Sequence, residues 1–142
     1  MLLKEIRIKR DGKWYANDAE MFRKPILNLF ANHLQRDEEG NYRIELNNET
    51  FPVIVDDVPF KAEIAAIKDS SIVFICHDQQ EILINRTIPI FFKGETPYIS
   101  YRWENDTRLG RSAFWMVSNH LVEKEGQVFL VPPSEKQDGW SE

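Results

Sequence analysis

The chain has 142 residues, a formal net charge of −5 and one cysteine. This length fits one compact domain or two small subdomains, and an acidic balance without a basic tail argues against duplex nucleic acid and an anionic membrane surface as partners. The single Cys76 excludes an intrachain disulfide and a multi-thiolate metal site. Charged residues follow Met1-Leu2-Leu3 at once, and no apolar run approaches the ~20 residues of a membrane span, so we expect a cytoplasmic protein.

The N-terminal segment is predicted to form a β-hairpin. Apolar and polar residues alternate over residues 4–9, which is typical of a half-buried strand. Asp11-Gly12 suits a tight turn, and residues 13–16 would return as the second strand. Cations recur along this hairpin, but a solvated outer strand face explains them better than a basic binding patch does.

The next segment predicts an amphipathic helix. Pro25 suits its first turn, where the missing N–H has no intrahelical partner anyway. Apolar residues and one histidine follow at helical spacing and would share one buried stripe: Ile26, Leu29, Phe30, His33 and Leu34. The helix is expected to end near Asp37, and strands at residues 42–46 and 51–55 are expected to follow.

The middle of the chain is predicted to be an antiparallel meander. β-formers fill three runs that are separated by polar turns: residues 60–68, 72–77 and 81–85. Pro89 and Pro97 bracket a further apolar run, which favours an edge strand or a packed loop there.

A second helix is expected after a strand at residues 98–103. Asn105 or Asp106 could cap its first turn by accepting from the free N–H groups. This helix would extend to about Val122, and a strand at residues 127–131 would follow it.

The two helical segments look like copies of one unit. Each ends in an Asn-His-Leu triplet, and a glycine and a strand follow it. At one constant offset the stripe of the first helix falls on Ala113, Met116, Val117, His120 and Leu121. The predicted fold class is α+β, with two similar strand–helix–strand subdomains forming an internal repeat around the antiparallel β meander. Residues 1–58 and 59–133 would be the two subdomains, and residues 134–142 a flexible tail.

His33 and His120 occupy equivalent places in the last turns of the two predicted helices. A pair lining a cleft between the copies could perform acid–base chemistry or bind a metal. The simpler interpretation is structural, because a histidine there interacts with the negative end of the helix dipole and can bond to free carbonyls. General-base catalysis by His33 or His120 stays open as an alternative hypothesis.

No motif in the chain indicates a catalytic residue, a cofactor or a metal, and we expect none of these. Cys76, His77 and Asp78 are successive on a predicted strand, where neighbouring side chains point to opposite faces and cannot form a nucleophile pair. Cys76 is therefore predicted to be a small core residue, and the next two residues to enter a turn. Ser112 lacks the second glycine of a nucleophile elbow.

The most informative residues are cations near the start of both predicted helices. Lys24 falls on Arg111 at the repeat offset, and a positive charge at a helix N-terminus is unfavourable by about 0.3–1 kcal/mol. Arg108 lies close to the second site. One compensation is an internal carboxylate, and the other is an anion held by helix N–H groups together with the cations. Carboxylates are available at Asp56, Asp57 and Glu63.

Four segments resemble a known bacterial family. They are Asp11-Gly12-Lys13-Trp14, the helix entry Arg23-Lys24-Pro25 with Leu29-Phe30, Asp56-Asp57-Val58-Pro59-Phe60, and Arg111-Ser112-Ala113-Phe114. Through them residues 4–132 resemble domain-of-unknown-function family 1285. The connector at residues 17–21 departs from the family, because it lacks the usual glycine and proline. The resemblance implies an α+β fold of two similar subdomains and a role in ligand or partner binding, with a link to signalling. It implies no known activity, cofactor or catalytic residue.

Together these features predict a non-enzymatic bacterial protein that binds a small anionic ligand or a protein partner at the junction of two repeated subdomains, in signal transduction. Lys24, Arg108 and Arg111 would supply positive charge, and Asp56 or Asp57 would orient them. The alternatives are an enzyme with a histidine base and a structural or scaffolding homodimer that associates through a surface around residues 90–101.

Overall fold

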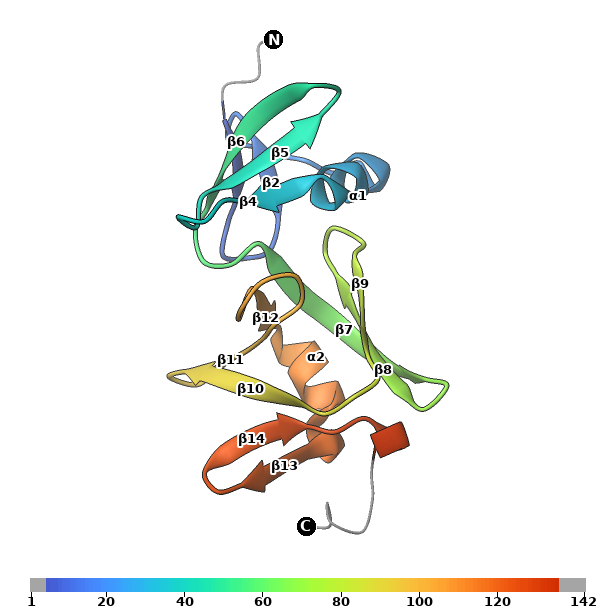
Figure 1. The fold of residues 1–142 in the computed structure, drawn as a ribbon. Coiled ribbons are helices and arrows are strands. Elements are labelled where there is room, and N and C mark those ends of the chain that lie inside the picture. The colour runs from blue at the N-terminus through green and yellow to red at the C-terminus, as the bar shows by residue number, and fades with distance from the viewer. Residues whose placement is uncertain (1–4, 136–142) are drawn as a thin grey trace. The chain divides into compact units, whose positions relative to one another are not determined.

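The computed structural model describes residues 5–135, so residues 1–4 and residues 136–142 of the predicted tail lie outside the described part. The described chain forms two compact units (Figure 1). The first unit extends to Pro59 and also includes His77–Gln80, whereas the second comprises Phe60–Cys76 and the chain from Glu81 onward. Helices and strands are both present, but strands predominate in each unit.

The first unit is built on a six-stranded sheet with the order β3-β2-β1-β6-β5-β4. Its strands are β1 (Ile6–Ile8), β2 (Trp14–Ala16), β3 (Ala19–Glu20), β4 (Leu34–Arg36), β5 (Tyr42–Leu46) and β6 (Glu49–Val55). All neighbours pair antiparallel except β1 and β6, which run parallel. The predicted alternation in β1 is confirmed, because Ile6 and Ile8 are buried while Arg7 between them is half-buried on the other face.

Two hairpin turns of this unit adopt the left-handed backbone that their residues favour. Gly12 has a φ of 84° between β1 and β2, and Asn47 and Asn48 have φ values of 55° and 65° between β5 and β6. In the second of these turns both central residues have positive φ, the geometry whose twist matches that of the flanking strands. Both turns lie where the sequence predicts them.

Helix α1 (Lys24–Asn32) buries a different stripe from the predicted one. Its buried residues are Leu27 and Ala31, whereas Ile26 and Leu29 of the predicted stripe are 37% and 41% exposed. Apolar residues lie on both sides of this helix, so their spacing alone does not decide which side meets the core. The predicted stripe is therefore wrong at these positions.

The helix also ends earlier than predicted. Residues 34–36 pair with β5 as strand β4, so a helix that continues to Asp37 is wrong. His33 closes α1, and its backbone N–H donates to the carbonyl of Phe30. Pairing between strands decides this boundary, because it satisfies the backbone groups that further helical turns would otherwise pair.

The second unit is built on an eight-stranded sheet with the order β13-β14-β10-β11-β12-β7-β8-β9. Its strands are β7 (Phe60–Lys68), β8 (Ser71–Cys76), β9 (Glu81–Ile84), β10 (Ile88–Lys93), β11 (Thr96–Ile99), β12 (Thr107–Leu109), β13 (Leu121–Lys124) and β14 (Gln127–Leu130). β7, β8 and β9 form the predicted antiparallel meander. The expectation of an edge strand or loop after Pro89 is wrong, because β10 pairs with both β14 and β11.

The eight-stranded sheet is strongly curved. β9 and β10 are five strand spacings apart in the sheet order, but only residues 85–87 separate them in the chain. Five spacings of a flat sheet would measure about 24 Å, whereas the four steps from Ile84 to Ile88 reach at most about 14 Å. The sheet therefore curls until β9 approaches β10, although the two strands do not pair in the described structure.

Helix α2 (Arg111–Met116) is much shorter than predicted. A 3-10 turn at Ser118–His120 follows it, and the chain then enters β13, so a helix that continues to Val122 is wrong. Residues that the prediction assigned to one long helix thus belong to β12, α2, the 3-10 turn and β13. None of the helices between residues 5 and 135 is both long and apolar enough to cross a membrane.

Gly110, and not the expected Asn105 or Asp106, stands directly before α2, and no side chain caps that helix. A Cβ atom at Gly110 would lie 2.9 Å from the carbonyl oxygen of Ala62 in β7, closer than real Cβ contacts come. The glycine therefore lets α2 begin against the strand, which explains why a small residue replaces a capping one.

Candidate functional site

The two acidic residues predicted to orient the site cations pair with arginines of the first unit. An oxygen of Asp56 accepts from Arg7 Nη1 at 2.5 Å, and an oxygen of Asp57 lies 3.2 Å from Arg10 Nη1. Both carboxylates directly follow β6, which runs beside β1 and brings them to these arginines. The structure thus gives Asp56 and Asp57 partners other than the predicted cations.

The three predicted cations belong to three different elements, one in the first unit and two in the second. In the first unit, the ammonium group of Lys24 donates to the carbonyl of His77 at 3.2 Å. In the second unit, Arg108 lies in β12 opposite Tyr98, and Arg111 is the exposed first residue of α2. Arg111 makes no ion pair with a described residue, and its six-residue helix has only a small dipole. A joint anion site of these cations stays a prediction.

The histidines lie at chain reversals. The ring Nδ1 of His33 lies 2.9 Å from the carbonyl oxygen of Leu29, one of the free carbonyls at the end of α1. His120 ends the 3-10 turn, and its backbone carbonyl accepts from the N–H of Val131. The contact with a free helix carbonyl that the structural interpretation of His33 expects is therefore present.

The Cys76-His77-Asp78 segment has the structural role that the sequence predicts. Cys76 is 2% exposed at the end of β8, and the next two residues enter the turn to β9. A carboxylate oxygen of Asp78 accepts from the backbone N–H of Gln80 at 2.9 Å and closes this turn. Residues 5–135 contain no group of three or more side chains that could hold a metal ion.

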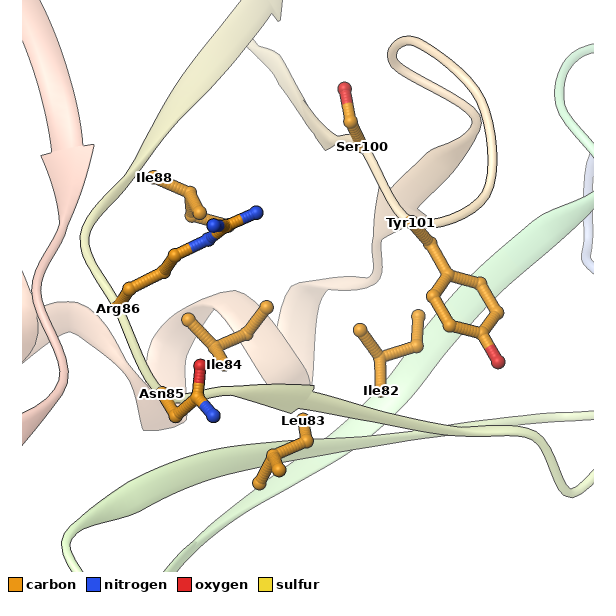
Figure 2. A pocket seen from close by; sticks show the side chains of 8 residues that line it. All are labelled: Ile82, Leu83, Ile84, Asn85, Arg86, Ile88, Ser100 and Tyr101. Carbon is orange, nitrogen blue, oxygen red and sulfur yellow. The ribbon is translucent and has the colours of Figure 1, made fainter.

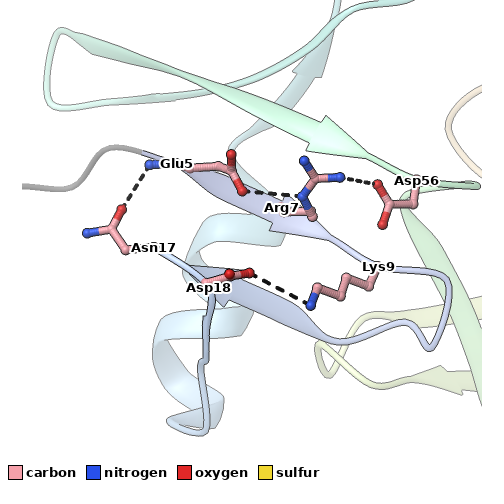
Figure 3. A network of polar contacts seen from close by, with 6 residues as sticks. All are labelled: Glu5, Arg7, Lys9, Asn17, Asp18 and Asp56. Atoms are coloured by element: carbon pink, nitrogen blue, oxygen red, sulfur yellow. Dashed lines mark hydrogen bonds and ion pairs between the residues drawn. The ribbon is translucent and has the colours of Figure 1, made fainter.

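The cations of the N-terminal hairpin form a charge-balanced face, and Figure 3 shows its contacts around β1. Lys9 Nζ lies 3.9 Å from Asp18, and Lys13 Nζ lies 3.9 Å from Glu20. Because each cation has a carboxylate beside it, this face presents little net positive charge. The predicted solvated strand face is confirmed for the part of the hairpin that the structure describes.

A cleft of about 240 Å³ opens in the second unit beside the segment that joins β9 to β10 (Figure 2). Ile82 and Ile84 of β9 form an apolar floor, because their side chains point to the same side of the strand. Arg86 stands on the connecting segment, and Ser100 and Tyr101 lie opposite, where the chain leaves β11. The curvature of the sheet therefore creates a partly apolar cleft with one cation.

Arg86 is the charged side chain among the residues that line this cleft. Figure 2 shows its guanidinium group extending over the floor near Ile84. The group has no hydrogen bond or ion pair with any described residue. The backbone N–H of the next residue, Thr87, donates to a carboxylate oxygen of Glu135 at 2.9 Å. This bond holds the segment that carries Arg86, while the N–H donors of Arg86 stay available.

Asp106 organises the opposite wall of the cleft. Its carboxylate is buried and accepts from three successive backbone N–H groups, those of Tyr101, Arg102 and Trp103, at 2.8, 2.9 and 2.9 Å. The hydroxyl of Thr107 donates to the same carboxylate at 3.1 Å. The residue expected to cap a helix therefore fixes the loop between β11 and β12.

The same loop positions the two hydroxyl-bearing residues of the cleft, Ser100 and Tyr101. The ring of Tyr101 packs edge-on against Phe60, with ring centroids 5.3 Å apart. The Ser100 hydroxyl oxygen accepts from the Asn105 N–H at 2.8 Å, so its own O–H can donate elsewhere. Contacts within the protein therefore fix the positions of Ser100 and Tyr101 in the wall that faces Arg86.

The sequence of one known domain family matches most of the first unit. Residues 3–58 match the N-terminal domain of DUF1285, a domain of unknown function. The N-terminal part of the chain is thus similar to the corresponding domain of the DUF1285 family. The resemblance read from the short sequence segments is thereby confirmed. No curated protein matches the chain.

Two solved DUF1285 structures share the fold of this chain. A DUF1285 family protein from Silicibacter pomeroyi DSS-3 has a TM-score of 0.73 and 20% sequence identity, over 93% of this chain and 76% of that one. A DUF1285 family protein from Shewanella baltica OS155 has a TM-score of 0.67 and 16% identity, over 80% of this chain and 90% of that one. At these identities the likeness concerns the fold alone.

Arg86 is the residue of this cleft that the sequence did not reveal. It lies between two β runs in a segment with no recognisable binding motif. A short connection between two strands that are far apart in the sheet indicates a curved sheet with a cleft beside the connecting residues. The connection from β9 to β10 is of this kind, but it can be recognised only when the strand order is known. Non-local pairing, and not residue spacing, therefore defines the site.

Proposed function

We propose that this protein is a non-catalytic binding protein, and that the cleft of its second unit takes a small ligand with one anionic group. The observation that carries the proposal is the position of Arg86. Its guanidinium group extends into a cleft and has no ion pair with any described residue. An unpaired arginine keeps its planar set of donors for a carboxylate or phosphate group.

The chemistry of the lining supports binding and not catalysis. Besides Arg86, the lining offers an amide, two hydroxyl groups and apolar side chains. It contains no histidine, cysteine or carboxylate that could move a proton or attack a substrate. The alternative bases His33 and His120 are not among the lining residues, so the cleft offers no support for the enzyme hypothesis.

The size of the cleft restricts the ligand. Its volume of about 240 Å³ lies below the roughly 300–1,000 Å³ of typical sites for drug-sized ligands. At the ~30 Å³ that a water molecule occupies in the liquid, the cleft holds about eight non-hydrogen atoms. A small carboxylate with an apolar body fits this volume and floor, whereas a nucleotide is too large.

Arg111 stays the candidate for a second anion contact, outside the cleft. It is exposed and has no ion pair with a described residue, while Lys24 already donates to a backbone carbonyl. A protein that binds a small anion without consuming it can report on the concentration of that anion. The signalling role implied by the family resemblance is consistent with such a function.

Thermal unfolding tests the proposal with acetate, butyrate, benzoate and inorganic phosphate as probes. A ligand at a hundred times its Kd adds about 2.7 kcal/mol to the free energy of unfolding, which corresponds to a rise in Tm of about 5–10 °C. We expect a rise with an apolar carboxylate that is lost in Arg86→Gln and kept in Arg111→Gln, the matched control. If the rise in Tm is lost in Arg111→Gln and kept in Arg86→Gln, the anion binds at α2 and not in the cleft. If no probe raises the Tm of the unsubstituted protein, the proposal is overturned.

We also propose that the helix–hairpin segments of the two units derive from one repeated unit. In both, the carbonyl of a histidine after the helix accepts a backbone N–H from further along the chain, from Glu45 to His33 and from Val131 to His120. In both, an antiparallel hairpin follows, β4–β5 and β13–β14. Superposition of the two segments in a crystal structure tests this idea. The two histidines should coincide, and a displacement by a residue or more would contradict the repeat.

A further inference from the structure

We infer that the occupant of the cleft is the C-terminal residue of a peptide or protein partner, which adds as a further strand to the free edge of β9 and places its carboxylate on Arg86. This inference rests on the proposed function, because it uses the same cleft and the same cation. It goes further by naming the ligand class and by involving the backbone of β9.

The backbone edge of β9 itself borders the cleft. Ile82, Leu83 and Ile84 all contribute to the lining, although successive strand residues point to opposite faces. All three can border one cleft only if the cleft meets the edge of the strand. β9 is the last strand in the sheet order and makes no described backbone bond beyond those to β8. Its outer N–H and C=O groups are therefore a ready template for an added strand.

A second hollow lies beside the same strand. Its volume is about 420 Å³, and Glu81 and Leu83 of β9 line it together with Lys68, Asp69 and Val73 from β7, β8 and the turn between them. Val73 and Leu83 are paired neighbours on the sheet. Figure 2 shows Leu83 pointing away from the floor formed by Ile82 and Ile84. An extended peptide along β9 would thus place alternate side chains toward the cleft and toward this hollow.

The position of Arg86 fixes the direction of the peptide. Arg86 lies two residues beyond the C-terminal end of β9, so a peptide with its carboxylate there runs parallel to β9. The four residues of β9 match about four peptide residues at the same rise. The apolar floor favours an apolar last side chain, and a leucine residue with its terminal carboxylate has about the size that the cleft holds. A free small anion would contact Arg86 alone. A peptide with a C-terminal carboxylate would contact Arg86, the apolar floor and the backbone edge of β9.

Peptide pools with two kinds of C-terminus test the inference. One pool contains acetylated pentapeptides that are random at four positions and end in leucine with a free carboxylate, and the other contains the same peptides as C-terminal amides. Fluorescence anisotropy and equilibrium dialysis measure binding to the full chain. We expect the free-acid pool to bind at least tenfold more tightly than the amide pool. Arg86→Gln should abolish this preference, and Arg111→Gln should keep it.

Backbone methylation separates a peptide strand from a simple anion. The best-retained peptide is resynthesised with N-methyl groups at alternate amides, which removes strand hydrogen bonds and keeps the carboxylate. We expect at least tenfold weaker binding for one of the two methylation patterns. If small carboxylates bind through Arg86 but no peptide binds, or if methylation has no effect, the peptide inference is overturned and the proposed function stands. If neither peptides nor small carboxylates bind, both are overturned.

Discussion

The cations along the β1 face of the first unit differ in their pairing from two arginines of the second unit. In the first unit, Arg7, Lys9 and Arg10 each lie within 4 Å of a carboxylate on or beside the β1 face. In the second unit, Arg86 and Arg111 have no ion pair with any described residue. The first arrangement balances charge along the β1 face, whereas the two arginines of the second unit have no described carboxylate beside them. The cluster of cations in the sequence of the hairpin therefore forms internal ion pairs, whereas the proposed site uses an isolated arginine.

Asp106 of the second unit also differs from the two aspartates that follow β6 in the first unit. Asp56 and Asp57 of the first unit lie at a partly exposed surface beside arginines. Asp106 of the second unit is buried and holds three backbone N–H groups without a cation in that bonding set. Surface ion pairs are typically worth little, about 0–1 kcal/mol, whereas a buried acceptor with several partners is costly to remove. The carboxylate of Asp106 should therefore matter more for folding than those of Asp56 and Asp57.

The largest expected effect is that of removing the Asp106 carboxylate. Asp106→Ala leaves the N–H groups of Tyr101, Arg102 and Trp103 without their acceptor, so we expect a loss of about 3 kcal/mol in the free energy of unfolding. Asp106→Asn keeps one acceptor oxygen and should lose less. Urea denaturation of the full chain measures both. A loss below about 1 kcal/mol in Asp106→Ala would contradict the view that this carboxylate organises the loop.

A smaller effect is expected at Asp57 in the first unit. Asp57→Asn removes the partner of Arg10, and we expect a loss of about 0.5–1 kcal/mol that shrinks in 1 M salt. Arg86→Gln in the second unit should leave the free energy of unfolding unchanged, because no described contact is lost. The same denaturation experiment at low and high salt compares the two variants. A large loss in Arg86→Gln would show that this arginine is structural, and the contrast between the units would fail.

The sequence predicts local structure well where one pattern dominates. The alternation in β1, the turns at Gly12 and Asn47-Asn48, and the meander of β7, β8 and β9 all lie where expected. Each depends on neighbours in the chain, such as a residue that tolerates positive φ or a period-two pattern. The family is also predictable, because its short segments include their own turns and helix entries.

The errors arise where distant strands decide the outcome. Helix α1 ends at Asn32 because β4 pairs with β5, and α2 is short because β12 and β13 take residues assigned to it. The cleft has the same origin, since Arg86 becomes important only when the curled sheet brings β9 toward β10. Pairing partners far apart in sequence cannot be read from local periodicity, and a site built on such pairing stays hidden with them.

The smallest expected effect concerns Tyr15 in the first unit, whose hydroxyl donates to a carboxylate oxygen of Asp11 at 2.8 Å. This hydrogen bond, together with partial burial and the negative charges of Asp11 and Glu20, raises the pKa of Tyr15 from 10.0 to about 12. Because the folded pKa lies above the unfolded one, the resulting stabilisation is complete below pH 10 and is lost as the pH rises toward 12.

Asp11→Asn removes the carboxylate charge and should return the pKa of Tyr15 toward its ordinary value near 10. The absorbance of tyrosinate at alkaline pH measures the titration, and subtraction of the Tyr15→Phe titration isolates this residue from the other tyrosines. An unchanged titration in Asp11→Asn would assign the shift to burial and not to the hydrogen bond. The titration should also be insensitive to a carboxylate bound at Arg86, because the Asp11–Tyr15 contact lies wholly within the first unit. If the carboxylate changes the titration of Tyr15, the two units are coupled. The charges of the first unit could then not be treated as independent of the site in the second.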